Sequence, residues 1–129
     1  MLIGAHVLLY SENPEADRTF FRDVLGLRSV DAGRGWLIFA LPPAEAAIHP
    51  TDADDRQQLH AGRHLLGALL YLMCDDLNLY VKLLEAKHVE CSPLEVAPWG
   101  TKTTIRLPSG GEIGLYQPTH PTALNLAAR

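Results

Sequence analysis

Histidine, glutamate and tyrosine side chains that could act on a small molecule are spread along this chain of 129 residues. Glu112 and Tyr116 are four positions apart, so they share one face if the segment between them is a strand. On such a face Glu112 could act as a general base and Tyr116 could donate a hydrogen bond to a ligand oxygen. His6, His49 and either this glutamate or Glu45 could form the two-histidine, one-carboxylate set of a non-haem iron site.

An internal repeat indicates which elements must position these residues. Short matches recur in the same order at offsets of 63 to 67 residues, including Ile3-Gly4-Ala5 with Leu66-Gly67-Ala68, Trp36 with Trp99, and Leu41-Pro42 with Leu107-Pro108. Self-similarity at a nearly fixed period predicts a duplicated module. We therefore expect one domain over residues 1–129, with module one at 1–50, a linker at 51–65, module two at 66–118 and a tail at 119–129.

Each module is predicted to run strand, helix and three more strands, which gives an α+β fold of two βαβββ modules. The expected strands are His6–Tyr10, Leu27–Val30, Trp36–Leu41 and Glu45–His49 in module one, and Leu69–Met73, Glu90–Cys91, Lys102–Leu107 and Glu112–Gln117 in module two. Asn13 and the pair Asp75-Asp76 are typical helix N-caps, and Gly26 suits a left-handed C-cap. The polar linker is expected to form at most a helical turn, with His60 and His64 on a solvated face.

Composition excludes several classes of partner. A net charge of −4 gives no electrostatic reason for nucleic-acid binding. The apolar runs are too short for a membrane span, and the apolar start lacks the basic flank of a signal peptide. Cys74 and Cys91 have no metal-binding or redox spacing, which is typical of buried thiols in a reducing compartment. These features predict a cytoplasmic protein.

Four segments, in this order and spacing, resemble the vicinal oxygen chelate superfamily, which contains glyoxalase I, the bleomycin resistance proteins and extradiol dioxygenases. They are His6–Tyr10, Phe20–Leu27, Cys74–Leu77 and Gly111–Gln117. The resemblance implies that each module curls a mixed sheet into a cup, with the helices outside and a small-molecule site on the concave face. It also implies a homodimer.

The resemblance further implies metal ligands in the first and last strand of each module. His6 matches the first of these four positions, whereas Ala47, Leu69 and Gly114 match the others and carry no donor atom. We therefore expect no metal cofactor. If a divalent metal binds, its ligands would be the displaced set of His6, His49 and Glu112.

Two main functions follow from the resemblance. The first is a binding protein of the antibiotic-resistance type, which holds a small apolar or aromatic molecule without the usual metal; its ligand-binding residues would be His6, Leu8, Trp36, His49 and Leu69. The second is a metal-dependent lyase, isomerase or extradiol-type dioxygenase, in which Glu112 and Tyr116 are the candidate catalytic residues. A third interpretation is a decayed site in a protein that acts through partner contacts.

Overall fold

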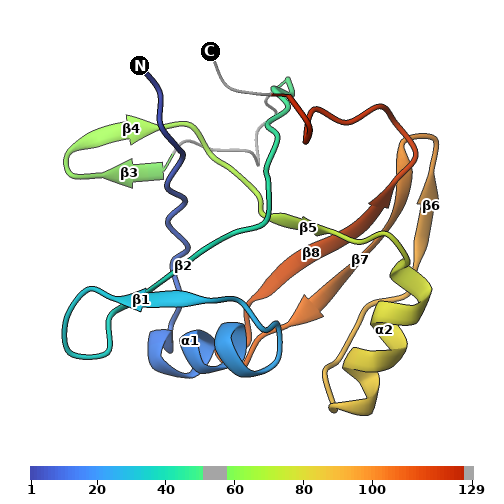
Figure 1. Ribbon diagram of the computed structural model, residues 1–129, viewed down its shortest axis with the longest axis horizontal. Helices are drawn as coiled ribbons and strands as arrows, with labels where there is room; N and C mark the ends of the chain where they lie inside the picture. The colour runs from blue at the N-terminus through green and yellow to red at the C-terminus, as the bar shows by residue number, and fades with distance from the viewer. Residues whose placement is uncertain (51–57, 127–129) are drawn as a thin grey trace.

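The computed structural model describes residues 1–50 and 58–126, and Figure 1 shows the arrangement of its elements. The elements are α1 (Pro14–Asp23), β1 (Ser29–Asp31), β2 (Leu37–Phe39), β3 (Gln58–His60), β4 (Arg63–Leu65), β5 (Tyr71–Met73), α2 (Leu77–Ala86), β6 (Glu95–Ala97), β7 (Gly100–Arg106) and β8 (Glu112–Pro118). The predicted α+β class is confirmed. Within the described ranges, neither helix is long and apolar enough to cross a membrane.

The two helices reproduce the sequence repeat. Both are ten residues long, and they begin at Pro14 and Leu77, which is the 63-residue offset of the two tryptophans. The Asn13 side chain accepts a hydrogen bond from the Ala16 N–H at 3.3 Å, and the Asp76 side chain accepts one from the Leu79 N–H at 3.1 Å. Each cap satisfies a backbone donor that has no partner inside the helix, so the helices start where the sequence predicts.

Module two contains a four-stranded sheet in the order β5-β8-β7-β6. Strand β5 is parallel to β8, while β7 is antiparallel to both β8 and β6. One predicted strand is corrected: Cys91 forms only an isolated bridge with Ile105, and the strand beside β7 is Glu95–Ala97 instead. Pro93 interrupts the segment, and a proline cannot donate a ladder hydrogen bond.

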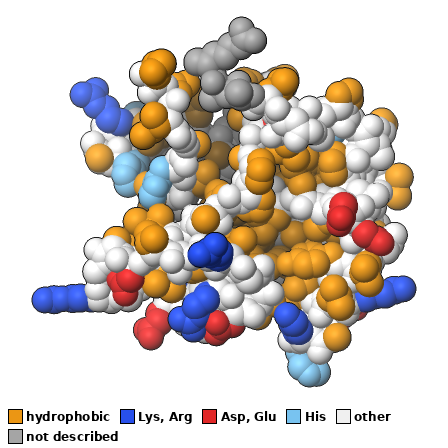
Figure 2. Space-filling model, viewed as in Figure 1, with side chains coloured by type: hydrophobic (Ala, Val, Ile, Leu, Met, Phe, Trp, Pro, Cys, Tyr) orange, Lys and Arg blue, Asp and Glu red, His pale blue; other side chains and the backbone are white. Residues whose placement is uncertain are grey.

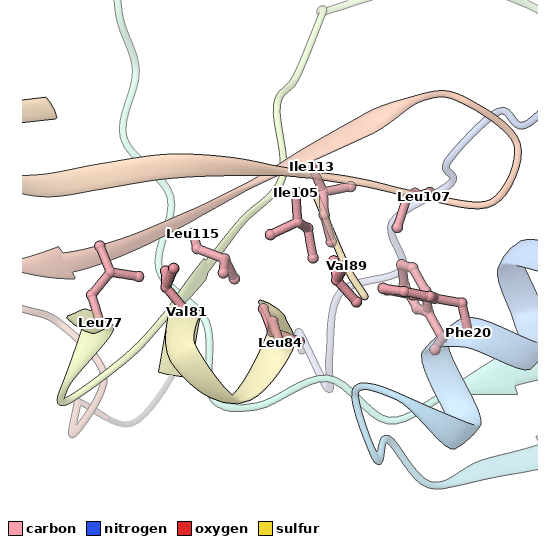
Figure 3. Packing of buried hydrophobic residues seen from close by; sticks show 10 residues of the cluster. Phe20, Leu77, Val81, Leu84, Val89, Ile105, Leu107, Ile113 and Leu115 are labelled. Carbon is pink, nitrogen blue, oxygen red and sulfur yellow. The ribbon is translucent and has the colours of Figure 1, made fainter. Parts of the chain in front are cut away.

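The hydrophobic core lies between this sheet and the helices. Ile113 and Leu115 of β8 are buried with Ile105 of β7 against Leu77, Val81 and Leu84 of α2, while Phe20 of α1 packs near Leu107 (Figure 3). Burial of such side chains contributes roughly 1.5–3 kcal/mol each. Because strand side chains alternate, this packing directs the neighbouring residues of β8 to the opposite face.

A buried carboxylate joins α1 to the turn between β7 and β8. Asp17 accepts hydrogen bonds from the Ser109 N–H at 3.0 Å, the Ser109 hydroxyl at 2.7 Å and the Ser11 hydroxyl at 2.6 Å. Asp17 is only 8% exposed, and its carboxylate is compensated by these three donors. The contact ties the helix of module one to the sheet of module two.

Module one has fewer strands than the sequence predicts. Only the β1–β2 hairpin forms there, shorter than the predicted segments, and His6–Tyr10 and Glu45–His49 contain no strand. A strand needs a neighbour for its backbone hydrogen bonds, and among the described residues no strand pairs with either of these two segments. Figure 1 shows residues 1–10 as a coil that leads into α1.

The predicted linker contains structure of its own. Residues 51–57 lie outside the described residues, but β3 and β4 form an antiparallel hairpin in a segment that was expected to be a linker with at most a helical turn. Ala61 and Gly62, at the tip, have φ of 50° and 76°, the left-handed pair that a two-residue hairpin turn requires. His60 and His64 therefore belong to two paired strands and share no helix face.

Candidate functional site

Tyr116 stands at the centre of an aromatic cluster on the sheet face opposite α2. We define the aromatic cluster as Tyr71, Trp99, Tyr116 and His120. The Tyr71 and Trp99 rings meet the Tyr116 ring edge-on, with centroids 5.7 and 5.8 Å away. The His120 ring stacks on Tyr116 at 6.0 Å with an interplanar angle of 25°. Figure 2 shows that hydrophobic side chains are exposed over much of the visible face of the molecule.

A glycine lets this cluster form. Gly114 lies opposite Tyr71 in the parallel pair of β5 and β8. A Cβ at position 114 would lie only 2.2 Å from Cδ1 of Tyr71. The Tyr71 ring therefore fills the space that a side chain of residue 114 would need.

A chain of polar contacts leads from Tyr116 to the C-terminal segment. The Tyr116 hydroxyl lies 3.1 Å from Nε2 of His120, and Nδ1 of His120 lies 2.7 Å from the Pro121 carbonyl oxygen. Oε2 of Glu45 lies 3.8 Å from Nε2 of His120, and Oε1 of Glu45 accepts a hydrogen bond from the Ala123 N–H at 2.8 Å. Partial burial, and then the charge of Glu45, raise the pKa of Tyr116, so its phenol stays protonated.

Glu112 occupies the same face of β8 as Tyr116, at the other end of the strand. It accepts a hydrogen bond from the Thr104 hydroxyl at 2.8 Å. The two cations of β7 on this face are paired with carboxylates: Lys102 with Glu95 at 3.5 Å and Arg106 with Glu90 at 3.0 Å. Lys102 also lies over the Trp99 ring at 5.6 Å.

The structure brings Glu112 and Tyr116 onto one face but does not gather the other predicted site residues there. His6, Leu8 and His49 are exposed in segments without strand, and Leu69 is 83% exposed just before β5. Trp36 is 62% exposed and lies under the guanidinium of Arg18 from α1, 4.6 Å from the ring centroid. Its repeat equivalent, Trp99, contacts Tyr116 instead.

Three residues of the aromatic cluster were not predicted as site residues, because the sequence patterns that could indicate their position are weak: Tyr71, Trp99 and His120. Trp99 was visible only as the repeat partner of Trp36, and of the two it was Trp36 that was predicted to bind the ligand. Tyr71 alternates with Leu70 and Leu72, which indicates the opposite face once the burial of Leu72 is known. His120 follows the last strand, in the predicted tail, where no periodicity exists to place a side chain.

Two shallow hollows are described away from the cluster. One, of about 370 Å³, lies between α2 and residues 91–94, and the other, of about 390 Å³, lies between residues 10–12 and residues 109–111. Neither contains His6, His49, Glu112 or Tyr116, so neither is the cavity that the sequence predicts. The aromatic cluster is a surface site.

The residues present do not fit the metal centre that the resemblance implies. Ala47, Leu69 and Gly114 offer no donor, and at position 114 the Tyr71 ring occupies the space of a ligand side chain. Among residues 1–50 and 58–126, no three His, Cys, Asp or Glu side chains gather closely enough to hold an ion. The displaced set of His6, His49 and Glu112 is thus not assembled.

The sequence matches the family model of the Glyoxalase/Bleomycin resistance protein/Dioxygenase superfamily over residues 4–115. The chain belongs to this superfamily. The resemblance noted from the four sequence segments is thereby confirmed. A comparison with curated proteins gives no significant match.

Solved structures of other superfamily proteins share the fold. A lactoylglutathione lyase from Agrobacterium tumefaciens superposes with a TM-score of 0.60 at 19% identity, over 89% of this chain and 92% of that one. TnmS3, an antibiotic binding protein from Streptomyces sp. CB03234, superposes with a TM-score of 0.59 at 23% identity, over 92% of this chain and 100% of that one. At 19% and 23% identity, these likenesses establish the fold alone. The functional site therefore has to be inferred from the residues of this chain.

Proposed function

We propose that this superfamily member binds a small apolar or aromatic molecule on the aromatic cluster, without the usual metal. The observation that carries the proposal is the set of three rings around Tyr116, on the sheet face opposite α2. Trp99 is still 42% exposed, so it has free surface to offer a ligand. Aromatic surfaces of this kind favour offset or edge-on contact with a flat ligand.

Two further points support this function over a metal-dependent reaction. The antibiotic binding protein TnmS3 has the same fold, and its coverage of this chain includes nearly all of it. The lactoylglutathione lyase also shares the fold, but an enzyme that polarises its substrate with a metal needs ligand side chains where this chain has Ala47, Leu69 and Gly114. We therefore rank the metal-dependent lyase, isomerase or dioxygenase second.

The two tryptophans provide a matched test of the site. A thermal-shift screen of aromatic compounds should give hits, because a ligand that binds only the folded state raises its melting temperature. Trp99→Ala should abolish these shifts, whereas Trp36→Ala should keep them, since Trp36 contacts Arg18 and not the cluster. Loss of the shifts in Trp36→Ala alone would move the ligand to module one and refute the proposed site.

We also propose that the chain forms a homodimer. Apolar side chains near the N-terminus are exposed, among them Ile3, Leu9 and Tyr10, and β5 has one edge without a partner strand among the described residues. Exposed apolar patches and open strand edges are typical of association surfaces. Light scattering should give twice the chain mass, and Leu9→Asp should lower it. A monomer at micromolar concentration would refute this proposal.

We also propose that the protein is cytoplasmic. Cys74 and Cys91 are both free thiols, as is usual in a reducing compartment. Burial raises the pKa of Cys74 to about 11, which keeps this thiol protonated and unreactive near neutral pH.

A further inference from the structure

The hydrogen-bond direction at Tyr116 can be worked out from its neighbours. A carbonyl oxygen only accepts hydrogen bonds, so Nδ1 of His120 must carry the proton that points at the Pro121 carbonyl, 2.7 Å away. In the neutral imidazole the other nitrogen, Nε2, is then an acceptor. The Tyr116 hydroxyl, 3.1 Å from Nε2, must therefore donate to His120. Its oxygen keeps free lone pairs but no free proton.

The other polar groups on this face are also acceptors or already paired. The Thr104 hydroxyl gives its proton to Glu112, so both oxygens at that contact can only accept further hydrogen bonds. Lys102 and Arg106 each face a carboxylate, from Glu95 and Glu90. Beside the Tyr116 hydroxyl a ligand therefore meets aromatic rings and a hydrogen-bond acceptor, while the ammonium of Lys102 lies at Trp99.

We propose that the aromatic cluster selects flat aromatic ligands whose polar edge donates a hydrogen bond, namely phenols and aromatic N–H compounds, through the oxygen of Tyr116. This inference rests on the proposed function, because it assumes that a ligand occupies the cluster. Tyr116 is the residue that discriminates among ligands, and it favours those that donate a hydrogen bond. Methyl ethers and carboxylates of the same ring system lack the donor and leave the Tyr116 oxygen unpaired.

Three probes with one ring system test the selection. Binding of 2-naphthol, 2-methoxynaphthalene and 2-naphthoate is followed by Trp99 fluorescence in a Trp36→Phe protein at pH 8. We expect 2-naphthol to bind roughly threefold to tenfold more tightly than the ether, the worth of one hydrogen bond. We expect 2-naphthoate also to bind more weakly than 2-naphthol, because it has no proton to donate to the Tyr116 oxygen.

Two variants separate the role of Tyr116 from general packing. Tyr116→Phe keeps the ring and removes the oxygen, so the preference for 2-naphthol over the ether should disappear. His120→Phe keeps the stacked ring and frees the Tyr116 proton, so the ether and the carboxylate should gain relative to 2-naphthol. Tyr10→Phe is the matched control, because Tyr10 also contacts a histidine, His60, but lies outside the cluster. This control should keep the wild-type order of affinities.

The outcomes distinguish the two proposals. Equal affinities in the wild type, or an unchanged preference in Tyr116→Phe, would overturn the donor selection and leave aromatic binding in place. Tightest binding of 2-naphthoate would overturn it in the same way. Failure of all three probes to change Trp99 fluorescence or the melting temperature would overturn the proposed function together with the inference.

Discussion

A side chain at position 114 and the ring of Tyr71 compete for the same space. The close approach of this ring to the Gly114 backbone places Tyr71 beside Tyr116, and so builds one wall of the aromatic cluster. The same approach excludes a metal-ligating side chain at this position of β8. Gly114 thus makes room for the aromatic cluster and removes one of the four expected metal-ligand positions.

Replacement of this glycine should be costly. Gly114→Ala places a Cβ 2.2 Å from Cδ1 of Tyr71, and relief requires the ring to leave its contact with Tyr116. We expect the free energy of unfolding in urea to fall by about 1–3 kcal/mol, as for other overpacked sites. Gly4→Ala is the control, because nothing lies within 4 Å of a Cβ there. Equal stability of the two variants would show that the ring moves freely.

Sequence reasoning reached only part of this site. Alternation along β8 correctly predicts that Glu112 and Tyr116 share a face, because that periodicity is local. The partners of Tyr116 come from β5, from the start of β7 and from the segment after β8, and no local pattern encodes such distant contacts. His120 and its neighbour Glu45, in particular, are brought together by the path of the C-terminal segment.

At the scale of elements, α1 makes its polar attachment to the sheet through one side chain, that of Asp17. Asp17 receives all three of its hydrogen bonds from outside the helix: one from Ser11, which precedes it, and two from Ser109, in the β7–β8 turn. Phe20 and Phe21 add apolar contact on the same side. The attachment therefore combines a buried polar network with core packing.

Removal of the Asp17 carboxylate should loosen this attachment. Asp17→Ala leaves the Ser109 N–H and two hydroxyls without their acceptor, so we expect a loss of about 2–4 kcal/mol in unfolding free energy. Glu15→Ala on the exposed side of α1 is the control and should change stability by less than about 0.5 kcal/mol. If both variants unfold at the same urea concentration, the network contributes no net stability.

The elements themselves differ in how far the sequence predicts them. The helices carry their own signals in Asn13, Pro14 and Asp76, and the observed helices begin at these residues. The apolar run His6–Tyr10 resembles a strand by composition, but a strand also needs a partner, and hydrophobicity does not identify one. The β3–β4 hairpin depends on the backbone conformation of Ala61 and Gly62, and this conformation cannot be predicted from the charged composition of the segment.

For the molecule as a whole, the absence of donor atoms at three of the four expected ligand positions predicts a low metal content. Protein purified without a histidine tag should contain well below one equivalent of iron, zinc, nickel or manganese per chain by elemental analysis. The reason is that Ala47, Leu69 and Gly114 cannot ligate, and His6 alone does not hold an ion. His6→Ala should leave the metal content unchanged. Nearly one equivalent, lost on His6→Ala, would favour the metal-dependent alternative.

The parallel pairing of β5 with β8 also sets an order of events as the chain folds. The β7–β8 hairpin closes a short turn between Arg106 and Glu112. Pairing of Tyr71 with Gly114 closes a much longer loop, which contains α2, β6 and β7. Closing the longer loop costs about 2 kcal/mol more in chain entropy, nearly three doublings of loop length. We infer that β5 docks after the hairpin, so the Tyr71 contact with Tyr116 completes late in refolding.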